Sequence, residues 1–280
     1  LLGNLHDFNP ATDAIPIAEL PLLDRWMLQR TAEVMDDITE AFESFEFFRF
    51  FQLLQNFCVT DLSNFYLDIA KDRLYVSAPA DQRRRSCQTV MALIIERLAG
   101  LIAPVLCHMA EDIWQNLPYP VEETSVFHRG WPTVPVEWRD AALSAPVQEL
   151  RELRAAVNKV LEDCRGRQEL GASLEAAVRI DARRPELQAA LSWLSETGDP
   201  EVDGLRDWLL VSQLQIGGEP WAEVLASQDD ELASIEVSRA RGTKCERCWH
   251  YEGDVGQHPE HPHICGRCVG VLERRTHQLA

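Results

Sequence analysis

Four cysteines near the end of the chain constrain its fold more than any other feature. Cys245 and Cys248 form one Cys-x-x-Cys pair, and Cys265 and Cys268 form a second pair after sixteen intervening residues. Each pair places two sulfurs on one tight turn, and four such thiolates bind Zn²⁺ tetrahedrally with no position left for water or substrate. The spacing therefore predicts one structural zinc ion, which folds a small module that lacks an extensive apolar core.

Spacing alone leaves two alternatives open. A site of three cysteines and one histidine competes because four histidines lie close to the pairs: His250, His258, His261 and His263. Disulfides fit less well, because the other four cysteines stand singly in apolar helical patterns, where a thiol behaves as a small hydrophobe. These are Cys58, Cys87, Cys107 and Cys164. Such usage is typical of a reducing compartment, so we expect a cytoplasmic protein.

The charge of the chain limits the partners that it can attract. Its net charge is −18, whereas the segment from Arg239 onward holds seven Lys and Arg against five Asp and Glu. A nucleic acid would therefore meet a local basic patch on an acidic protein, and this chain would not supply most of the affinity. No apolar run approaches the roughly 20 residues that span a bilayer, and no signal peptide is visible. Because the chain begins without methionine, we expect a piece of a larger protein.

Apolar residues recur at three- and four-residue steps in the first half of the chain, which predicts four amphipathic helices in an antiparallel bundle. The four segments are residues 23–45, 47–69, 79–100 and 104–117. Pro79 and Pro104 are expected in the first turns of the third and fourth helices. The second segment has the widest apolar face, which favours a central position in the bundle. Residues 118–145 are rich in Pro and aromatic residues and are expected to wrap the bundle.

The pattern changes after a charged helix expected from Pro146 to Arg167. Residues 174–181 alternate apolar and polar side chains, which predicts a strand. We expect a helix at 185–195, a helix end running into a strand at 208–216, and a strand at 234–239. The fold class is therefore mainly α, with a helical bundle, a small α/β subdomain and a four-cysteine zinc module. The expected domains are residues 1–21 (a connector from a missing N-terminal part), 22–145 (bundle and wrap), 146–238 (α/β) and 239–280 (zinc module).

No catalytic constellation is present, since the sequence lacks a glycine-rich phosphate loop, a serine elbow and a His-Glu-x-x-His motif. Basic and aromatic residues that suit contacts with nucleic acid occur in three groups. They are Lys71 and Arg73; Arg83, Arg84 and Arg85; and Arg241, Lys244, Arg247, Trp249 and Arg267. The competing interpretation is an ordinary solvated or salt-bridged surface, and for Trp249 packing over the zinc knuckles.

Several blocks of the sequence resemble one family in order along the chain. Leu-Asp-Arg-Trp at 23–26, Phe-Tyr-Leu-Asp-Ile-Ala-Lys-Asp-Arg-Leu-Tyr at 65–75 and Arg-Arg-Ser-Cys-Gln-Thr at 84–89 are similar to the anticodon-binding domain of bacterial isoleucyl-tRNA synthetases. Lys-Cys-Glu-Arg-Cys-Trp-His-Tyr at 244–251 and Ile-Cys-Gly-Arg-Cys at 264–268 resemble the C-terminal zinc module of those class Ia enzymes. The resemblance covers essentially the whole chain.

The resemblance implies that the bundle docks the anticodon stem-loop of isoleucine tRNA, and that the four cysteines bind zinc close to the anticodon. Family members activate isoleucine with ATP and Mg²⁺ in a catalytic domain whose His-Ile-Gly-His and Lys-Met-Ser-Lys-Ser signatures are absent here. The chain is thus expected to be an inactive, monomeric recognition part of an enzyme, with that catalytic domain as its partner and no membrane association. The alternatives are a valine or leucine enzyme of the same class and a non-catalytic zinc-ribbon module that binds nucleic acid or protein. DNA glycosylases that end in a similar zinc module resemble only the tail.

Overall fold

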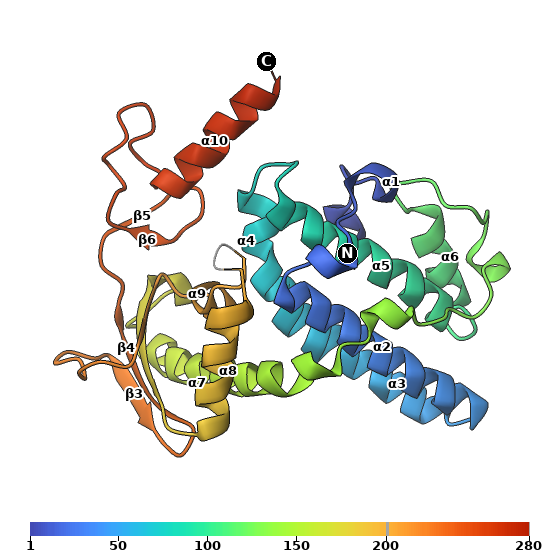
Figure 1. Ribbon diagram of the computed structural model, residues 1–280, viewed down its shortest axis with the longest axis horizontal. Coiled ribbons are helices and arrows are strands. Elements are labelled where there is room, and N and C mark those ends of the chain that lie inside the picture. Colours follow the sequence, from blue (N-terminus) through green and yellow to red (C-terminus); the bar gives the residue numbers. More distant parts are fainter. Residues whose placement is uncertain (200–201, 280) are drawn as a thin grey trace. The chain divides into compact units, whose positions relative to one another are not determined.

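The computed structural model describes residues 1–199 and 202–279, with side chains up to residue 274 in the last helix. It divides the chain into two compact units, Leu1–Leu143 and Ser144–Ala280. The first is helical and the second combines a sheet, helices and the cysteine-rich tail (Figure 1). The expected division into four segments is finer than these two units and stays a prediction.

Long helices dominate the first unit, as the apolar periodicity predicts. The principal helices are α2 (Leu22–Glu43), α3 (Phe47–Asn56), α4 (Asp68–Val76), α5 (Gln82–Ile102) and α6 (Cys107–Gln115), and short helices α1 (Pro10–Asp13), η1 (Leu2–Asn4) and η2 (Ile17–Glu19) precede them. Between α3 and α4 the backbone stays helical as a π-helical stretch, η3 (Phe57–Leu67). The predicted second helix is therefore one continuous rod with an altered hydrogen-bond register in its middle.

The two prolines do not begin helices. Pro79 lies in a turn, and α5 begins three residues later, where the Asp81 side chain accepts a hydrogen bond of 2.9 Å from the Arg83 amide. An aspartate at this position satisfies an amide that the helix leaves without a partner, so it fixes the start more strongly than a proline. Pro104 likewise lies in the turn before α6. Both starts were predicted three residues too early.

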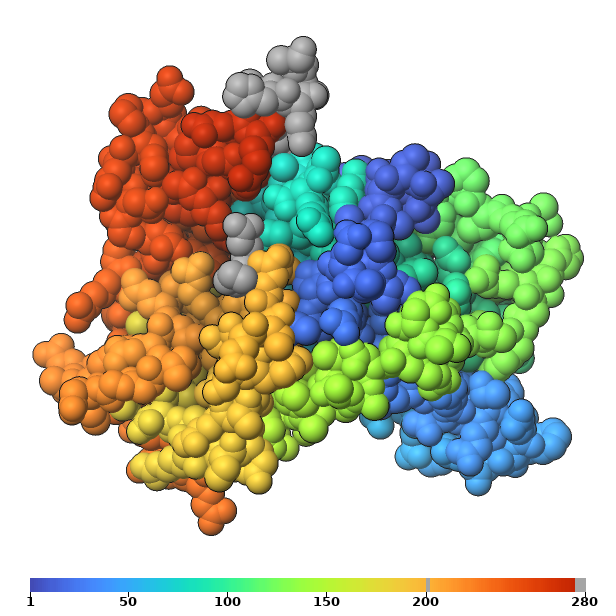
Figure 2. Space-filling model, in the orientation of Figure 1, coloured from blue at the N-terminus to red at the C-terminus, as the bar shows by residue number. Residues whose placement is uncertain are grey.

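The apolar face of α3 is not central. Phe50 is its only buried residue, whereas Phe47, Phe48 and Phe51 are more than half exposed. This end of the first unit protrudes in Figure 2, in light blue. The prediction of a central helix is wrong here, because the face that the core uses belongs to η3 and α4, where Phe57, Phe65 and other residues are buried.

Residues 118–143 follow the bundle as turns and the short helices η4 (Val126–His128), η5 (Val136–Trp138) and η6 (Ala141–Leu143). Trp138 is buried, with the Arg97 guanidinium 5.5 Å from the centre of its ring. A hydrogen bond and an ion pair attach the segment to α2. The Trp131 indole donates to the Thr39 hydroxyl at 3.0 Å, and Arg139 pairs with Asp36 at 2.7 Å. The segment thus lies along the bundle, as its composition predicts.

The single cysteines only partly follow the expectation of buried thiols. Cys87 and Cys164 are buried, and burial raises the pKa of the Cys87 thiol to about 12. Cys58 is half-buried and Cys107, the first residue of α6, is exposed. In the described part of the chain, none of the four is joined in a disulfide.

A four-stranded sheet organises the second unit, in the order β2-β1-β4-β3. The strands are β1 (Ala176–Ala182), β2 (Gln213–Ile216), β3 (Ala226–Asp229) and β4 (Ala233–Arg239). β1 runs parallel to β2 and antiparallel to β4, and β4 is antiparallel to β3. Helices α7 (Ser144–Gly166) and α8 (Pro185–Thr197) bury Val178, Ile180, Ile235 and Val237 on one face, and α9 (Leu205–Leu209) leads into β2. The predicted strands at 174–181, 208–216 and 234–239 are thus present, whereas β3 was not predicted.

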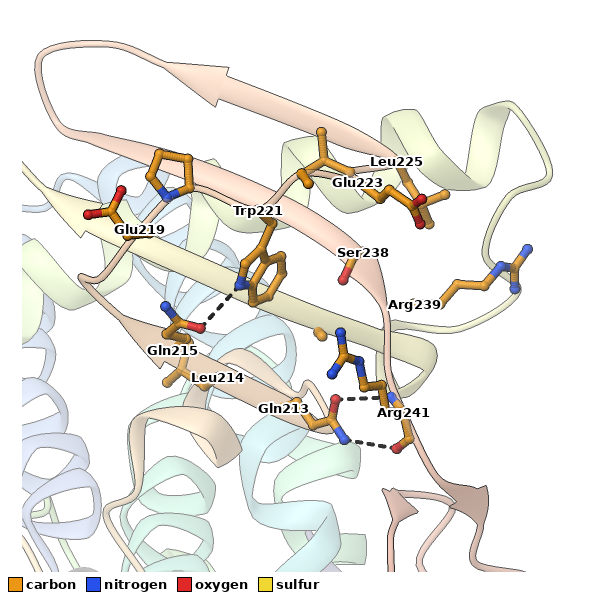
Figure 3. Close-up of a pocket in the computed structure, with 14 residues that line it drawn as sticks. Gln213, Leu214, Gln215, Glu219, Trp221, Glu223, Leu225, Ser238, Arg239 and Arg241 are labelled. Atoms are coloured by element: carbon orange, nitrogen blue, oxygen red, sulfur yellow. Dashed lines mark hydrogen bonds between the residues drawn. The ribbon is translucent and has the colours of Figure 1, made fainter.

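The opposite face of the sheet is polar and carries Arg179, Glu236 and Ser238. A loop covering residues 217–225 folds over this face (Figure 3). The sheet is followed by a two-stranded ribbon, β5 (Thr243–Lys244) with β6 (Tyr251–Glu252), and by α10 (Gly266–Leu279). These elements carry the four cysteines of the tail.

Candidate functional site

The four tail cysteines converge on one point. Their sulfur atoms all lie within 4.8 Å of one another, and all four residues are buried. The Cys245 and Cys268 sulfurs are 3.8 Å apart, and the Cys248 and Cys265 sulfurs are 3.7 Å apart. A regular tetrahedron with metal–sulfur bonds of about 2.3 Å separates its sulfurs by about 3.8 Å. The quartet therefore has the dimensions of a four-thiolate zinc site.

Backbone bonds set each pair of sulfurs on a knuckle. The Cys245 amide donates to the His250 carbonyl at 2.8 Å, and the Trp249 amide donates back to the Cys245 carbonyl at 2.9 Å. Trp249 closes this turn with a φ of 68°, a left-handed conformation that non-glycine residues seldom adopt. In the second knuckle the Val269 amide donates to the Cys265 carbonyl at 3.0 Å. The Cys265 amide also donates a hydrogen bond of 3.4 Å to the Cys245 sulfur, and this bond joins the two knuckles.

Asp254 and Gly266, which were not predicted as site residues, complete the second knuckle. The Asp254 carboxylate accepts a hydrogen bond of 2.7 Å from the Gly266 amide, between the two cysteines of the second knuckle. That bond lowers the pKa of Asp254. A Cβ added at Gly266 would lie 2.7 Å from the same carboxylate oxygen, so a larger residue there would displace the Asp254 side chain. In the sequence, the Cys-Gly-Arg-Cys motif indicates Gly266, and no local pattern indicates Asp254.

The ribbon that carries the first knuckle also depends on a glycine. Gly242 has a φ of 99°, and a Cβ there would lie 2.5 Å from the Glu252 carbonyl oxygen on the facing strand. Beyond the ribbon, Glu252 pairs with Arg206 at 3.2 Å, and the Tyr251 amide donates to the Ser212 hydroxyl at 2.8 Å. These contacts attach the cysteine-rich module to the α9–β2 corner of the sheet within the second unit.

The histidines near the knuckles have other roles. His258 lies 3.4 Å from the Asp254 carboxylate, and His263 lies 3.9 Å from the Glu246 carboxylate. His250 is buried and gives its carbonyl to the first knuckle. Among the described residues the four cysteines are the one metal-binding group that the geometry brings together. The arrangement therefore favours four cysteines over three cysteines and one histidine.

Hydrogen bonds between the thiols shift their pKa values in opposite directions. A hydrogen bond with Cys248 lowers the pKa of the Cys265 thiol to about 4, and the same kind of bond raises the pKa of the Cys268 thiol. Arg247 adds a donor 3.7 Å from the Cys268 sulfur. Four thiolates so close together repel one another, and a divalent cation at the centre removes this repulsion.

Several predicted nucleic-acid contacts lie on the surface of this module. Trp249 is 61% exposed, and the Lys244 ammonium lies 5.8 Å from the centre of its ring. Arg241 is exposed as well, whereas Arg247 and Arg267 are half-buried. Trp249 therefore does not form a mini-core over the knuckles. It presents an aromatic face with a cation beside it.

Lys71 and Arg73 are separated by their environments. Lys71 is exposed and pairs with Asp68 at 2.6 Å. Arg73 is 2% exposed and binds the Asp24 carboxylate, the Ser86 hydroxyl at 2.7 Å and the Arg83 carbonyl at 3.1 Å. No ligand reaches this guanidinium, so the prediction that Arg73 contacts nucleic acid is corrected to a structural role. Tyr66 completes the network with a bond of 2.6 Å to Asp24.

Two of the three consecutive arginines, Arg84 and Arg85, bind the protein's own N-terminal segment. Arg84 donates two hydrogen bonds to the Asp7 carboxylate, and Arg85 donates to the Asp7 carbonyl at 2.8 Å and lies over the Phe8 ring. Burial opposes ionisation of Asp7, but hydrogen bonds from Gln88 and Arg84 outweigh it and lower the pKa of that carboxyl. Arg83 lies 3.7 Å from Asp72. In place of the expected phosphate contacts, Arg84 and Arg85 hold the N-terminal segment against α5, and Arg83 faces Asp72 of α4.

None of the described helices combines the length and apolarity that crossing a membrane requires.

Comparison with known proteins finds related sequences for both units. Residues 24–180 match the family described as the anticodon-binding domain of tRNA ligase, and residues 242–270 match a zinc finger found in FPG and IleRS. The chain is 88% identical over 279 residues to an isoleucine–tRNA ligase of Parasynechococcus marenigrum (strain WH8102), covering all of this chain and 29% of that protein. Isoleucine–tRNA ligases of Prochlorococcus marinus (strain MIT 9313) and Synechococcus sp. (strain CC9311) are 75% and 77% identical, each over 98% of the chain and 28% of their own length. The chain thus spans under a third of these relatives.

Proposed function

Because the chain belongs to the family of anticodon-binding domains of tRNA ligases, we propose that it is the tRNA-recognition part of an isoleucine–tRNA ligase. The ligand would be isoleucine tRNA, held at its anticodon stem-loop. One observation carries the proposal. The segment that matches a zinc finger brings four sulfurs together as a tetrahedron and exposes a lysine beside a tryptophan, on a chain whose helical unit matches the anticodon-binding family.

We propose that the quartet holds one zinc ion in a structural role. Four sulfurs saturate the ion, so it offers no position for a substrate or an activated water. Its contribution is to fix the two knuckles, and with them Lys244, Arg247 and Trp249, at defined angles. A metal-held loop loses less conformational entropy when it binds RNA, because its side chains start from a fixed backbone.

The surface residues suit different parts of an RNA strand. Lys244, Arg241 and Lys71 offer exposed charge to phosphates. Trp249 offers a π-face to an unstacked base of a loop, and Arg267 adds a planar donor group near the second knuckle. The net charge of −18 opposes the approach of a polyanion, so we expect modest affinity that falls steeply with salt.

Formation of an aminoacyl-adenylate from isoleucine and ATP, with Mg²⁺, would belong to the parts of the relatives that this chain does not match. The chain alone would bind and position the tRNA without catalysing a reaction, as a monomer joined to a catalytic domain. A cytoplasmic location agrees with reduced cysteines and is part of the same proposal.

The proposal is tested by the affinity of the zinc-loaded chain for two transcripts at one fixed, low salt concentration. One is isoleucine tRNA, and the other is the same tRNA with a changed anticodon. We expect the changed anticodon to weaken binding at least about fivefold, since each lost base contact is worth about 1–3 kcal/mol. Equal affinities for the two transcripts would contradict anticodon recognition. Trp249→Ala should narrow the difference between them, whereas Trp131→Ala, which removes a partly exposed tryptophan of the first unit, should not.

A further inference from the structure

A cavity of about 900 Å³ lies on the polar face of the sheet in the second unit, beneath the loop of residues 217–225 (Figure 3). Its walls come from β1, β2, β4 and this loop, and they include Gln213, Ser238, Trp221 and Arg241. Its volume is in the range of small-molecule sites. Except for Ala177, the residues that line the cavity lie between positions 180 and 242, which neither of the two family matches covers.

A buried ion pair fixes the loop over the cavity. Arg179 is 2% exposed, pairs with Glu236 at 3.2 Å and donates to the Gly218 carbonyl at 2.5 Å. Glu236 in turn accepts a hydrogen bond of 2.8 Å from the Trp221 amide. The Trp221 indole nitrogen donates to Gln215 at 3.1 Å, which fixes the ring above the sheet. The aromatic wall of the cavity is thus preorganised.

Arg241 is fixed at the opposite side. Its amide donates to the Gln213 side chain at 3.0 Å, and its carbonyl accepts from the same side chain at 2.8 Å. In Figure 3 the Arg241 side chain extends over the sheet toward Trp221, whereas Arg239 extends away from it. Within the described part of the chain the Arg241 guanidinium forms no ion pair, so its donors are available to a ligand.

We propose that this cavity binds one nucleoside phosphate unit, an unpaired nucleotide of the bound RNA, with the base on the Trp221 indole and the phosphate on Arg241. The inference rests on the proposed function. An indole face and a guanidinium are the groups with which proteins hold single-stranded RNA. Ser238 adds a hydroxyl for the base edge or the ribose, and the carboxylate of Glu223 would accept from an exocyclic amino group.

The charge of the cavity decides between an RNA nucleotide and a free nucleotide. Glu219 and Glu223 also line it, as does Arg239, so two arginines face two carboxylates. A phosphodiester carries a single negative charge, whereas a nucleoside triphosphate carries about four, for which this lining has no excess of positive charge. Arg241 also lies three residues before Lys244, which accompanies the exposed Trp249. A short segment of chain therefore joins the cavity to the exposed Lys244–Trp249 pair.

The test uses the zinc-loaded 280-residue chain, isoleucine tRNA as the probe, and a matched pair of charge removals. Arg241→Ala should weaken binding five- to twentyfold and reduce the salt dependence by about one phosphate contact. Lys159→Ala removes the same charge from an exposed position on α7, which packs on the other face of the sheet, and should leave the affinity within twofold. Trp221→Ala should weaken binding roughly five- to 150-fold, the range for loss of one stacked base, and Trp221→Phe should restore most of it.

Equal losses for Arg241→Ala and Lys159→Ala would overturn the inference, because they would show an effect of net charge alone. So would unchanged binding of Trp221→Ala. In either case the wild-type chain still binds the tRNA, and the proposed function stands. Failure of the wild-type chain to bind the tRNA would instead remove the proposed function and the inference with it. A second arm cross-links tRNA that contains 4-thiouridine to the peptide around Trp221 and adds cytidine monophosphate as competitor. A cross-link that the mononucleotide suppresses supports the site. Binding of the mononucleotide without any tRNA cross-link would assign the cavity to a free nucleotide.

Discussion

Asp24→Ala tests the idea that a buried polar network, rather than apolar packing alone, holds the helices of the first unit in register. Asp24 is fully buried and binds both Tyr66 and Arg73, which come from η3 and α4. Arg73 is also tied to Ser86 and to the Arg83 carbonyl at the start of α5. One carboxylate therefore links three consecutive helical segments to α2.

The expected loss of stability follows from the burial of Arg73. Removing one partner of a buried ion pair leaves an uncompensated charge and costs about 3–5 kcal/mol. Tyr66→Phe removes one hydrogen bond to a charged group and should cost less, about 1.5–3 kcal/mol. Since a domain is stable by about 5–15 kcal/mol, Asp24→Ala is expected to leave the first unit marginally folded.

Urea unfolding followed by far-ultraviolet circular dichroism measures this loss, because the first unit contributes most of the long helices. The double variant Asp24→Leu with Arg73→Leu is the control, since it removes both charges and should recover much of the loss. A cost below about 1 kcal/mol for Asp24→Ala, or a double variant less stable than Asp24→Ala, would refute the reasoning.

Two further predictions concern a glycine and a carboxylate. Gly242→Ala should loosen the ribbon and speed the loss of zinc to a chelator, because its Cβ would meet the Glu252 carbonyl at 2.5 Å, whereas Gly253→Ala, with nothing within 4 Å, should not; equal rates would contradict the steric argument. The lowered pKa of Asp7 means that its attachment to Arg84 stabilises the fold above the unfolded pKa of about 3.9 and is lost as the pH falls through the lower folded value. Hydrogen exchange of residues 1–13 should therefore accelerate only in strong acid, and Asp7→Asn should abolish that pH dependence; acceleration already near neutral pH would rule this out.

The sequence predicted the features that depend on spacing. The two Cys-x-x-Cys pairs meet as a tetrahedron because knuckle geometry is local to each pair. The principal helices and the strands β1, β2 and β4 also followed from periodicity. β3 was missed because Ala226–Asp229 is half polar and lies at a sheet edge, so it carries no apolar alternation. The π-helical stretch was missed because it changes the backbone register without changing the spacing of apolar residues.

The roles of charged residues were the least predictable part. Arg73, Arg84 and Arg85 have the composition of a phosphate-binding surface, yet the fold brings Asp24 and Asp7 to them from distant positions in the sequence. Such pairings are set by tertiary structure, and no local pattern encodes them. By contrast, Lys244 and Trp249 stay exposed because the knuckle between them is too small to bury either side chain. The same limit applies to the cavity on the sheet, whose wall joins Gln213, Trp221 and Arg241 from separate segments.

X-ray absorption at the zinc edge is the most direct measurement of the centre from which the RNA-facing residues are positioned. The purified chain should contain one zinc per molecule, with four sulfur neighbours at about 2.3 Å and no lighter atoms in the coordination shell. Nitrogen or oxygen neighbours, or a zinc content well below one with the cysteines oxidised, would contradict a closed four-thiolate site.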